Sequence, residues 1–226
     1  MSTTLKTTIV VATLNSAAFV ERALRSIEEQ SRRADEVVVV DGGSTDATLE
    51  IVKRYEFATV VTQNSMGYHR AWNEAIGISR GDVLCFLDSD DVLAPSAIER
   101  ALTVLEEDRQ ADVVFGKVQF FPEAETFPKG FREHLKSGAH HADIPGSMFV
   151  RRTVFERIGR FPDDWQILSD VAWFADLARS ECKVVRLADV SLSKCVRENS
   201  LSLSAAKQQL YSNELKRLVR RQFGLR

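Results

Sequence analysis

The stretch Val83-Leu-Cys-Phe-Leu-Asp-Ser-Asp-Asp91 places two acidic side chains, Asp88 and Asp90, directly after a continuous apolar run. A short apolar run of this kind is typical of a strand that is buried on both faces of a parallel sheet. Alternate residues of an extended chain point to the same side, so both carboxylates are expected to face one space. They repel each other unless a positive charge lies between them, which predicts a divalent cation that carries substrate phosphates. The other interpretation is that Asp90 or Asp91 caps the next helix.

Strand-like and helix-like patterns alternate along the first half of the chain. Strands are expected over Thr8–Thr13, Glu36–Val40, Ala58–Thr62, Asp82–Leu87 and Asp112–Phe120. Helices are expected after the cap-type residues Asn15 and Ser16, after a cap at Thr45 or Asp46 through Tyr55, and over Tyr68–Ser79 and Pro95–Glu107. This alternation predicts βαβ units and a mainly parallel sheet, whose ligands bind beyond the carboxyl ends of the strands.

The second half is less regular. Residues 121–145 contain three prolines and two glycines and predict a long loop, of the kind that often covers a binding site. Further helices are expected over Arg152–Ile158, Ser169–Arg179 and Leu203–Phe223, and a strand over Lys183–Leu187.

Composition narrows the class of protein. The 226 residues suit one large domain or two small ones, at roughly 150 residues per domain. Apolar residues make up 44% and charged residues 27%, which excludes a disordered, collagen-like or coiled-coil chain. A net charge of −2 argues against nucleic-acid binding. The three cysteines form no CxxC pair, and no apolar run approaches the roughly 20 residues of a spanning helix, so we expect a cytoplasmic protein.

A second acidic turn, Asp41-Gly-Gly-Ser-Thr-Asp46, follows the strand expected at Glu36–Val40. Its glycines let the backbone approach a ligand closely, and a carboxylate can accept hydrogen bonds from ribose or base. An ordinary turn followed by a helix cap is the other interpretation. The sequence has neither the GxGxxG fingerprint nor a P-loop.

Four blocks follow one another in the first half: Thr8–Asn15, Val38–Asp46, Asn64-x-x-Gly67-x-x-x-Ala71-x-Asn73 and Gly81–Asp91. This series resembles the family-2 glycosyltransferases, which have the GT-A fold. Three later blocks resemble the acceptor half of that family: Gly146–Arg152, Phe155-x-x-Ile-Gly-x-Phe161 and Ser169-Asp170-x-x-Trp173. The resemblance implies an α/β fold with a Rossmann-like, mainly parallel sheet flanked by helices. Residues 1–120 would then bind the nucleotide sugar, and the less regular residues 121–226 would bind the acceptor.

The same resemblance implies roles for individual residues. Asp170 would be the catalytic base that deprotonates the acceptor hydroxyl in an inverting, single-displacement reaction. Asp88 and Asp90 would hold Mn²⁺ or Mg²⁺ together with the donor diphosphate. The residues expected to bind substrate are Thr13, Asn15, Asp41, Gly67, Arg70, Asp88, Ser89 and Trp173.

Some of these residues have a second interpretation. Arg70 can pair with a phosphate or be an exposed helix residue. Trp173 can stack on a sugar, although tryptophan more commonly packs in a core. The cluster His140-His141-x-Asp143 lacks the spacing of known zinc motifs, so we interpret it as a solvated loop near the acceptor site.

Three positions depart from the family pattern. Ala12 replaces the usual proline after the first strand, and Gly42 replaces a second acidic residue, so Asp41 alone would bind the nucleoside. The family often has Arg-x-His before a late serine. The segment Arg197-Glu-Asn-Ser lacks that histidine, which puts an extra phosphate or metal contact there in doubt.

The tail Lys207–Arg226 carries six basic side chains and one acidic side chain, Glu214. On a helical wheel most of the basic residues share one face and the leucines share another. The pattern predicts either peripheral contact with an anionic membrane surface, on its inner face, or a terminal helix packed on the domain.

These observations favour a metal-dependent, inverting glycosyltransferase. Its donor would be a nucleotide sugar, UDP-linked, and its acceptor a hydroxyl group in polysaccharide or glycolipid biosynthesis or on a small metabolite. The alternative is a non-catalytic nucleotide-sugar-binding protein on the same fold, which would not need a base. A sugar-phosphate nucleotidyltransferase is disfavoured because Thr13–Val20 is not a glycine-rich, arginine-containing phosphate loop.

Overall fold

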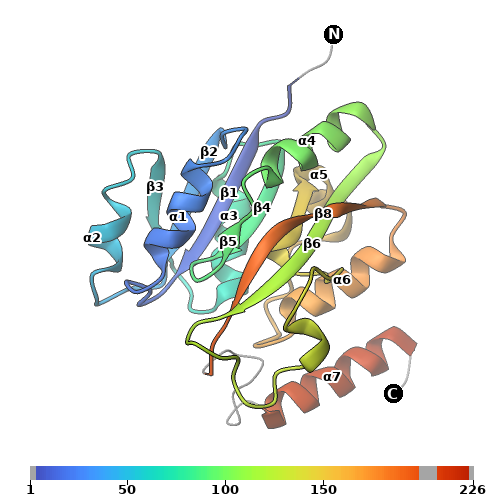
Figure 1. Ribbon diagram of the computed structural model, residues 1–226. Helices are drawn as coiled ribbons and strands as arrows, with labels where there is room; N and C mark the ends of the chain where they lie inside the picture. The colour runs from blue at the N-terminus through green and yellow to red at the C-terminus, as the bar shows by residue number, and fades with distance from the viewer. Residues whose placement is uncertain (1–3, 199–207, 224–226) are drawn as a thin grey trace.

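Four parallel strands at the predicted positions form one half of an eight-stranded sheet. The computed structural model describes residues 4–198 and 208–223, and every statement about the structure refers to these (Figure 1). The four strands are β1 (Thr7–Thr13), β2 (Glu36–Asp41), β3 (Ala58–Thr62) and β4 (Val83–Asp88). Strand order across the sheet is β3-β2-β1-β4-β7-β6-β8-β5, so β1 lies between β2 and β4. The mixed α/β class and the mainly parallel sheet are confirmed.

The other half of the sheet comes from later segments and differs from the prediction. Its strands are β5 (Val92–Leu93), β6 (Ala111–Pro122), β7 (Met148–Arg151) and β8 (Lys183–Val196). Strand β7 pairs antiparallel with both β4 and β6, and β5 pairs antiparallel with β8. The sequence did not predict β5 or β7, because segments of two and four residues show no periodicity. Strand β8 extends nine residues beyond the expected Lys183–Leu187.

The helices lie on both faces of the sheet (Figure 1). They are α1 (Val20–Glu28), α2 (Thr48–Val52), α3 (Tyr68–Ile78), α4 (Ala97–Glu107), α5 (Arg152–Ile158), α6 (Ser169–Arg179) and α7 (Gln208–Phe223). Helix α1 begins at Val20, later than the cap-type residues Asn15 and Ser16 suggested, because a turn closed by Ser16 O precedes it. The closing helix was predicted from Leu203, but residues 203–207 lie outside the described part.

Two apolar layers explain why the β4 segment is continuously apolar. Val83, Cys85 and Leu87 pack with α1 and α4 on one face of the sheet. Leu84 and Phe86 pack with α3, α5 and α6 on the other face. All five side chains are at most 1% exposed. A strand covered on both faces needs no polar position, so its acidic residues are confined to its carboxyl end.

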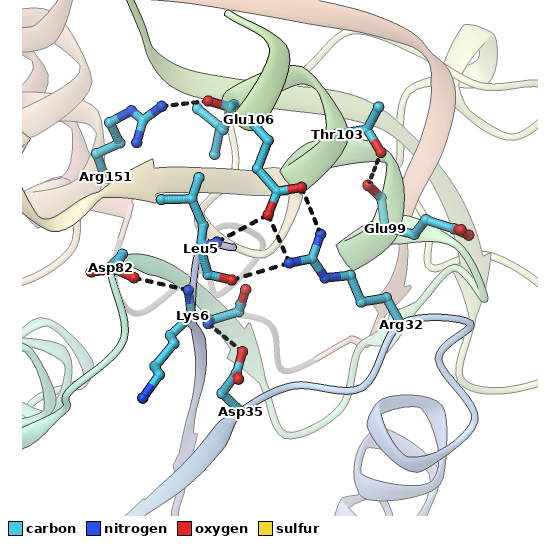
Figure 2. Close-up of polar contacts among 11 residues, drawn as sticks. Leu5, Lys6, Arg32, Asp35, Asp82, Glu99, Thr103, Glu106 and Arg151 are labelled. Carbon is cyan, nitrogen blue, oxygen red and sulfur yellow. Dashed lines mark hydrogen bonds and ion pairs between the residues drawn. The ribbon is translucent and has the colours of Figure 1, made fainter. Parts of the chain in front are cut away.

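At the amino ends of the parallel strands, half-buried polar groups hold the start of β1 in place (Figure 2). The Glu106 carboxylate accepts hydrogen bonds from Leu5 N at 2.9 Å and from both terminal nitrogens of Arg32 at 3.0 and 2.8 Å. Arg151 Nη2 donates to Leu105 O at 2.5 Å. These bonds join α4 to β1, to β7 and to the loop before β2, at the edge away from the strands' carboxyl ends.

The long loop predicted over residues 121–145 is largely confirmed. After β6 ends at Pro122 it contains one short 3₁₀ turn, Glu133–Leu135, and a single backbone bridge between Val118 and His140. A second 3₁₀ turn, Pro145–Ser147, leads into β7. Within residues 4–198 and 208–223 there is no helix of the length and apolarity that crossing a membrane requires.

Candidate active site

The sheet brings three of the predicted site residues to one edge. Thr13 ends β1, Asp41 ends β2 and Asp88 ends β4. In the sheet register Thr13 is the partner of Asp41, and Ala12 is the partner of Asp88. The carboxyl ends of neighbouring parallel strands therefore place these side chains next to one another, as the βαβ pattern predicted.

Three carboxylates gather just beyond β4. One oxygen each from Asp88, Asp90 and Asp91 lies within 4.8 Å of the others. Carboxylate oxygens at such spacing suit a hard divalent cation, so the residues present fit Mn²⁺ or Mg²⁺. The sequence assigned only Asp88 and Asp90 to a metal, and Asp91 adds a third carboxylate. No helix is capped by these residues, because α4 begins only at Ala97.

Two basic side chains compensate the acidic cluster. Lys194 Nζ lies 3.1 Å from Asp88 Oδ2 and 2.9 Å from Asp91 Oδ2, between the two carboxylates. The Arg197 guanidinium lies 2.7 Å from Asp90 Oδ2. Both cations come from the carboxyl-end part of β8 and the residue that follows it, more than 100 positions further along the chain. The positive charge that the carboxylate pair requires is thus supplied within the chain itself.

Burial and mutual repulsion shape the titration of this cluster. Burial raises the pKa of Asp90, and the charge of Asp88 raises it further. Burial lowers the pKa of Lys194, but attraction by Asp91, Asp88 and Asp90 outweighs it, so the net pKa is raised. Lys194 therefore carries a positive charge at neutral pH.

Asp41 closes its own turn. Its Oδ2 accepts from Gly43 N and Ser44 N at 2.9 Å each, and its Oδ1 accepts from Ser44 Oγ at 2.5 Å. Asn15, at a φ of 47°, accepts at Oδ1 from Thr45 N at 2.9 Å and ties this turn to the end of β1. Both residues build the loops of the expected nucleoside site.

Thr13 presents an unsatisfied polar atom at this edge. Its side chain is 5% exposed, and within the described residues its Oγ1 has no hydrogen-bond partner. A buried hydroxyl without a partner is costly unless a ligand or a water completes it. This matches the expectation that Thr13 lies against the nucleotide, which stays a prediction.

The remaining substrate residues have different surroundings. Gly67 precedes α3 with a φ of 125°, a conformation that favours glycine. Arg70, in the first turn of α3, is half-buried and donates from Nη1 to Met66 O at 3.5 Å, which among the described residues leaves other guanidinium donors available. Ser89 donates from its Oγ to Ser16 Oγ at 2.8 Å, which joins the acidic loop to the segment after β1.

Asp170 lies in the first turn of α6, as predicted. A helix N-terminus by itself favours an ionised carboxylate. Burial acts more strongly, and it raises the pKa of Asp170 to about 6. The Val171 N–H lowers this pKa and the negative charge of Asp88 raises it, so Asp170 and the acidic cluster lie within electrostatic reach of each other. A carboxyl with a pKa of about 6 is ionised at pH 7 and is a stronger base than an ordinary aspartate.

Trp173 lies in the core. It is 1% exposed, its Nε1 donates to Gly159 O at 2.8 Å, and its ring contacts Phe155, Phe161 and Phe174. A sugar cannot stack on a ring that has no exposed face, so this placement favours the core-packing interpretation over substrate contact.

The histidine cluster does not form a metal site among the described residues. His140 Nε2 is hydrogen-bonded to Ser137 O at 2.9 Å. The Asp143 carboxylate accepts hydrogen bonds from both terminal nitrogens of Arg186, that from Nη2 at 3.1 Å. Among the residues that the structure describes, the potential metal ligands that lie together are Asp88, Asp90 and Asp91.

Lys194 was not predicted from the sequence, and the role of Arg197 stayed open. Lys194 sits in a strand and has no neighbouring acidic residue in sequence, so spacing gives no signal. Only the pairing of Val92 with Ser193 and Leu93 with Leu192 brings it to the acidic loop. Asp91, in contrast, was visible as the last residue of the quoted stretch.

Comparisons with known proteins identify the family of this chain. The family model for glycosyl transferase family 2 matches residues 8–159. A PGL/p-HBAD biosynthesis glycosyltransferase of Mycobacterium bovis (strain BCG / Pasteur 1173P2) is 30% identical over 169 residues, covering 72% of this chain and 65% of that protein. Glycosyltransferase AglE of Haloferax volcanii is 28% identical over 179 residues, covering 73% of this chain and 59% of that protein. The chain thus spans less than two thirds of the length of these relatives.

Solved structures share the fold. TarS 1-349 of S. aureus, in complex with UDP-GlcNAc, superposes with a TM-score of 0.73 at 24% identity, covering 89% of this chain and 61% of that one. The mannosyltransferase PcManGT of Pyrobaculum calidifontis, in complex with GDP-Man and Mn²⁺, superposes with a TM-score of 0.67 at 23% identity, covering 88% and 59%. These neighbours confirm the GT-A type of fold, and the family match covers both the acidic cluster and the strands that hold it. The chain therefore belongs to glycosyl transferase family 2.

Proposed function

We propose that this chain is an inverting glycosyltransferase that moves a sugar from a UDP-linked donor to a hydroxyl acceptor. The acidic cluster beyond β4 is the observation that carries the proposal, because it gathers carboxylates that suit a divalent cation at the sheet edge where the unsatisfied Thr13 hydroxyl also lies. Known relatives named for PGL/p-HBAD biosynthesis favour an acceptor on a glycolipid or polysaccharide precursor.

Donor binding falls to the strand ends of residues 1–120. Asp88 and Asp90 would hold Mn²⁺ or Mg²⁺, which when bound offsets the negative charge of the departing diphosphate. Asp41 and Asn15, which build the loops at this edge, would contact the nucleoside, and Arg70 would bind a phosphate. UDP as the nucleotide is supported by the likeness to a structure that holds UDP-GlcNAc, although another neighbour holds GDP-Man.

Catalysis falls to Asp170, in the acceptor half at residues 121–226. Its carboxylate removes the proton from the acceptor hydroxyl while that oxygen attacks the anomeric carbon and the bond to the diphosphate breaks. This single displacement inverts the anomeric configuration. The raised pKa of Asp170, about 6, leaves the group ionised at pH 7 and improves it as a base.

The test is isothermal titration of UDP with and without Mn²⁺. We expect the wild type to bind UDP more tightly with Mn²⁺, and Asp90→Asn to lose that difference. Asp108→Asn is the matched control, since Asp108 pairs with Lys183 at the far end of β8. Equal affinity with and without metal in the wild type would contradict the donor site.

A non-catalytic nucleotide-sugar-binding protein remains the alternative function. The compensation of the acidic cluster by Lys194 and Arg197 is the observation that favours it, because a pure binder needs no exchangeable cation. An assay of sugar transfer distinguishes the two functions, because a non-catalytic binding protein transfers no sugar under any condition.

We place the protein in the cytoplasm, with peripheral contact to anionic lipid through α7. Helix α7 leaves Tyr211, Leu215 and Val219 about 40% exposed, and the exposed Lys216 and Arg220 lie beside them. Such an arrangement of apolar and basic side chains suits the interface of a membrane surface. Arg217 and Arg221, two further basic residues of α7, instead pair with Asp164 and Asp176 on the domain.

A further inference from the structure

The backbone just before the proposed base is bonded to a single buried carboxylate on α7. Glu214 Oε1 accepts from Gln166 N at 2.7 Å, and Glu214 Oε2 accepts from Ile167 N at 3.0 Å and Leu168 N at 2.8 Å. Glu214 is 6% exposed. Three consecutive N–H groups thus converge on one anionic side chain, a geometry in which each hydrogen bond is charge-assisted.

Helix α3 also binds the backbone of this segment, residues 166–168. Tyr68 Oη, at the start of α3, donates to Ile167 O at 2.5 Å. Burial raises the pKa of Tyr68, and the negative charge of Asp170 raises it further, so the phenol stays protonated and remains a donor. The Ile167 residue therefore has its N–H bound by α7 and its C=O bound by α3.

This segment sets where α6 begins. Leu168 flanks the first helical residue, Ala172 N donates to Leu168 O at 2.8 Å, and Ser169 Oγ donates to Pro162 O at 2.8 Å. Asp170 lies in the first turn, two residues after the bound segment. A displacement of residues 166–168 is passed directly to the Asp170 carboxyl. A misplacement of about 1 Å in a reacting group can cost on the order of 100-fold in rate.

Helix α7 reaches this segment because it packs along α6 (Figure 1). Leu218 is 6% exposed among Trp165, Ile167 and Leu168, and Arg221 Nη2 lies 2.6 Å from Asp176 Oδ2 on α6. Arg217 stacks over Trp165 with its guanidinium carbon 4.4 Å from the ring centroid. These contacts would dock α7 without Glu214, so the buried carboxylate is available for a more specific role.

We propose that Glu214 is a positioning residue for Asp170: by binding the N–H groups of residues 166–168 it holds the proposed base in its reactive position. The inference rests on the proposed function of Asp170 and adds a residue from outside the donor and acceptor loops. Helix α7 then contributes to the chemistry as well as to the stability of the domain.

The test is Glu214→Gln, which keeps the shape of the side chain. The amide replaces one accepting oxygen by an N–H₂ group, so at least one of the three backbone donors loses its partner. Arg217→Gln is the matched control, because it removes another α7 contact to the same loop, the pairing with Asp164, and leaves the carboxylate in place. Lys216→Gln controls for a charge change on the exposed face of α7.

Three readouts are taken on the full chain. Backbone amide exchange at residues 166–168 should rise about tenfold or more in Glu214→Gln only. The pKa of Asp170, followed by carboxyl ¹³C shifts, should fall by about 1 unit from near 6, because a loosened segment admits water to the carboxyl. Turnover is followed as the UDP produced, with the UDP-sugar that gives the highest rate. Its kcat should fall about tenfold or more, while KM for that donor stays within twofold.

Several results would overturn the proposal. An unchanged Asp170 titration in Glu214→Gln would show that the carboxylate does not position the base. If kcat falls equally in Glu214→Gln and Arg217→Gln, the loss comes from weaker docking of α7 in general and not from the Glu214 carboxylate. If Glu214→Gln fails to fold, Tyr68→Phe removes the bond to Ile167 O from the other side, and it should give the same fall in kcat and the same shift in the Asp170 titration; its failure to do so counts against the proposal.

Failure of the proposed function has a different signature. If Asp170→Asn keeps normal transfer, Asp170 is not the base, whatever Glu214→Gln does to the amides. If Asp170→Asn abolishes transfer and Glu214→Gln leaves kcat unchanged, the base is right and the positioning role is wrong. The two proposals are therefore separable in one set of variants.

Discussion

Replacing Lys194 by methionine should strengthen the binding of Mn²⁺ to the acidic cluster. Lys194 Nζ lies between Asp88 and Asp91, where it competes with an added cation for the same oxygens. Methionine keeps an unbranched side chain of similar length and removes the charge. The variant therefore tests whether the chain's own ammonium group limits the metal affinity of the site.

The size of the effect follows from Coulomb's law. Two unit charges about 4 Å apart interact by about 4 kcal/mol at an effective dielectric of about 20. The Lys194 side chain is 27% exposed, so solvent screens part of this. If about a third of one such interaction survives, it is worth about 1.4 kcal/mol, which corresponds to a tenfold change in Kd. We expect Lys194→Met to bind Mn²⁺ about tenfold more tightly.

The assay is titration of Mn²⁺ into the nucleotide-free protein, followed by the loss of the free-ion electron paramagnetic resonance signal. Lys183→Met is the control, because Lys183 pairs with Asp108 at the other end of the same strand, β8. Removing Lys194 also leaves the buried Asp91 without its cation, which lowers stability. Mn²⁺ should therefore raise the Tm of Lys194→Met by more than it raises the Tm of the wild type.

Unchanged or weaker Mn²⁺ binding by a folded Lys194→Met protein would refute this reasoning. That result would mean that the ammonium group holds the carboxylates in the geometry a metal needs. A similar gain in affinity for Lys183→Met would show that the effect depends only on net charge.

Three further predictions follow from the site, the sheet and α7. Transfer should fall as the pH drops through about 6, because protonated Asp170 cannot accept a proton, and Asp170→Asn should lower kcat by about 10²–10⁴-fold with UDP affinity unchanged; a flat pH profile would exclude it as the base. Gly116→Ala should lower the free energy of unfolding in urea by about 1–3 kcal/mol, because the added Cβ would lie 1.7 Å from Ser191 Oγ on β8, and an unchanged midpoint would contradict that packing. Salt-sensitive co-sedimentation with anionic vesicles should be lost in the double variant Lys216→Gln and Arg220→Gln, and negligible binding by the wild type would leave only the packed-helix interpretation.

Local patterns were sufficient for the parallel half of the sheet and for its acidic edge. Strands such as β4 are continuous apolar runs because two layers of helices cover them, and that pattern is readable from sequence. The antiparallel strand β7 was not readable. Its four residues, Met148–Arg151, form a strand because β4 and β6 leave a gap that this segment fills, which is a property of the assembled sheet.

The same limit applies to the site. The acidic loop and Asp170 carry sequence motifs, but the groups that modulate them do not. Lys194 lies in a strand and Glu214 in a helix, and each contacts residues at least 46 positions away in the sequence. No local spacing of residue types therefore predicts these contacts. In the tail, Glu214 is the single acidic side chain, and it is buried, whereas the basic residues of α7 are exposed. Burial of a charged side chain depends on the partners that the fold supplies.

The insertion of β7 beside β4 has a mechanical consequence. It bonds the strand that carries the acidic loop directly to a strand of the acceptor half, through the pairs Val83 with Arg151 and Leu84 with Val150. The proposed donor and acceptor halves therefore share one hydrogen-bonded sheet, which joins them at β4 and β7. Closure around a bound sugar cannot come from swinging one half over the other without breaking the ladder. Any closure would therefore come from segments outside the sheet, such as the long loop after β6, and we expect changes in that loop to alter the rate of substrate entry.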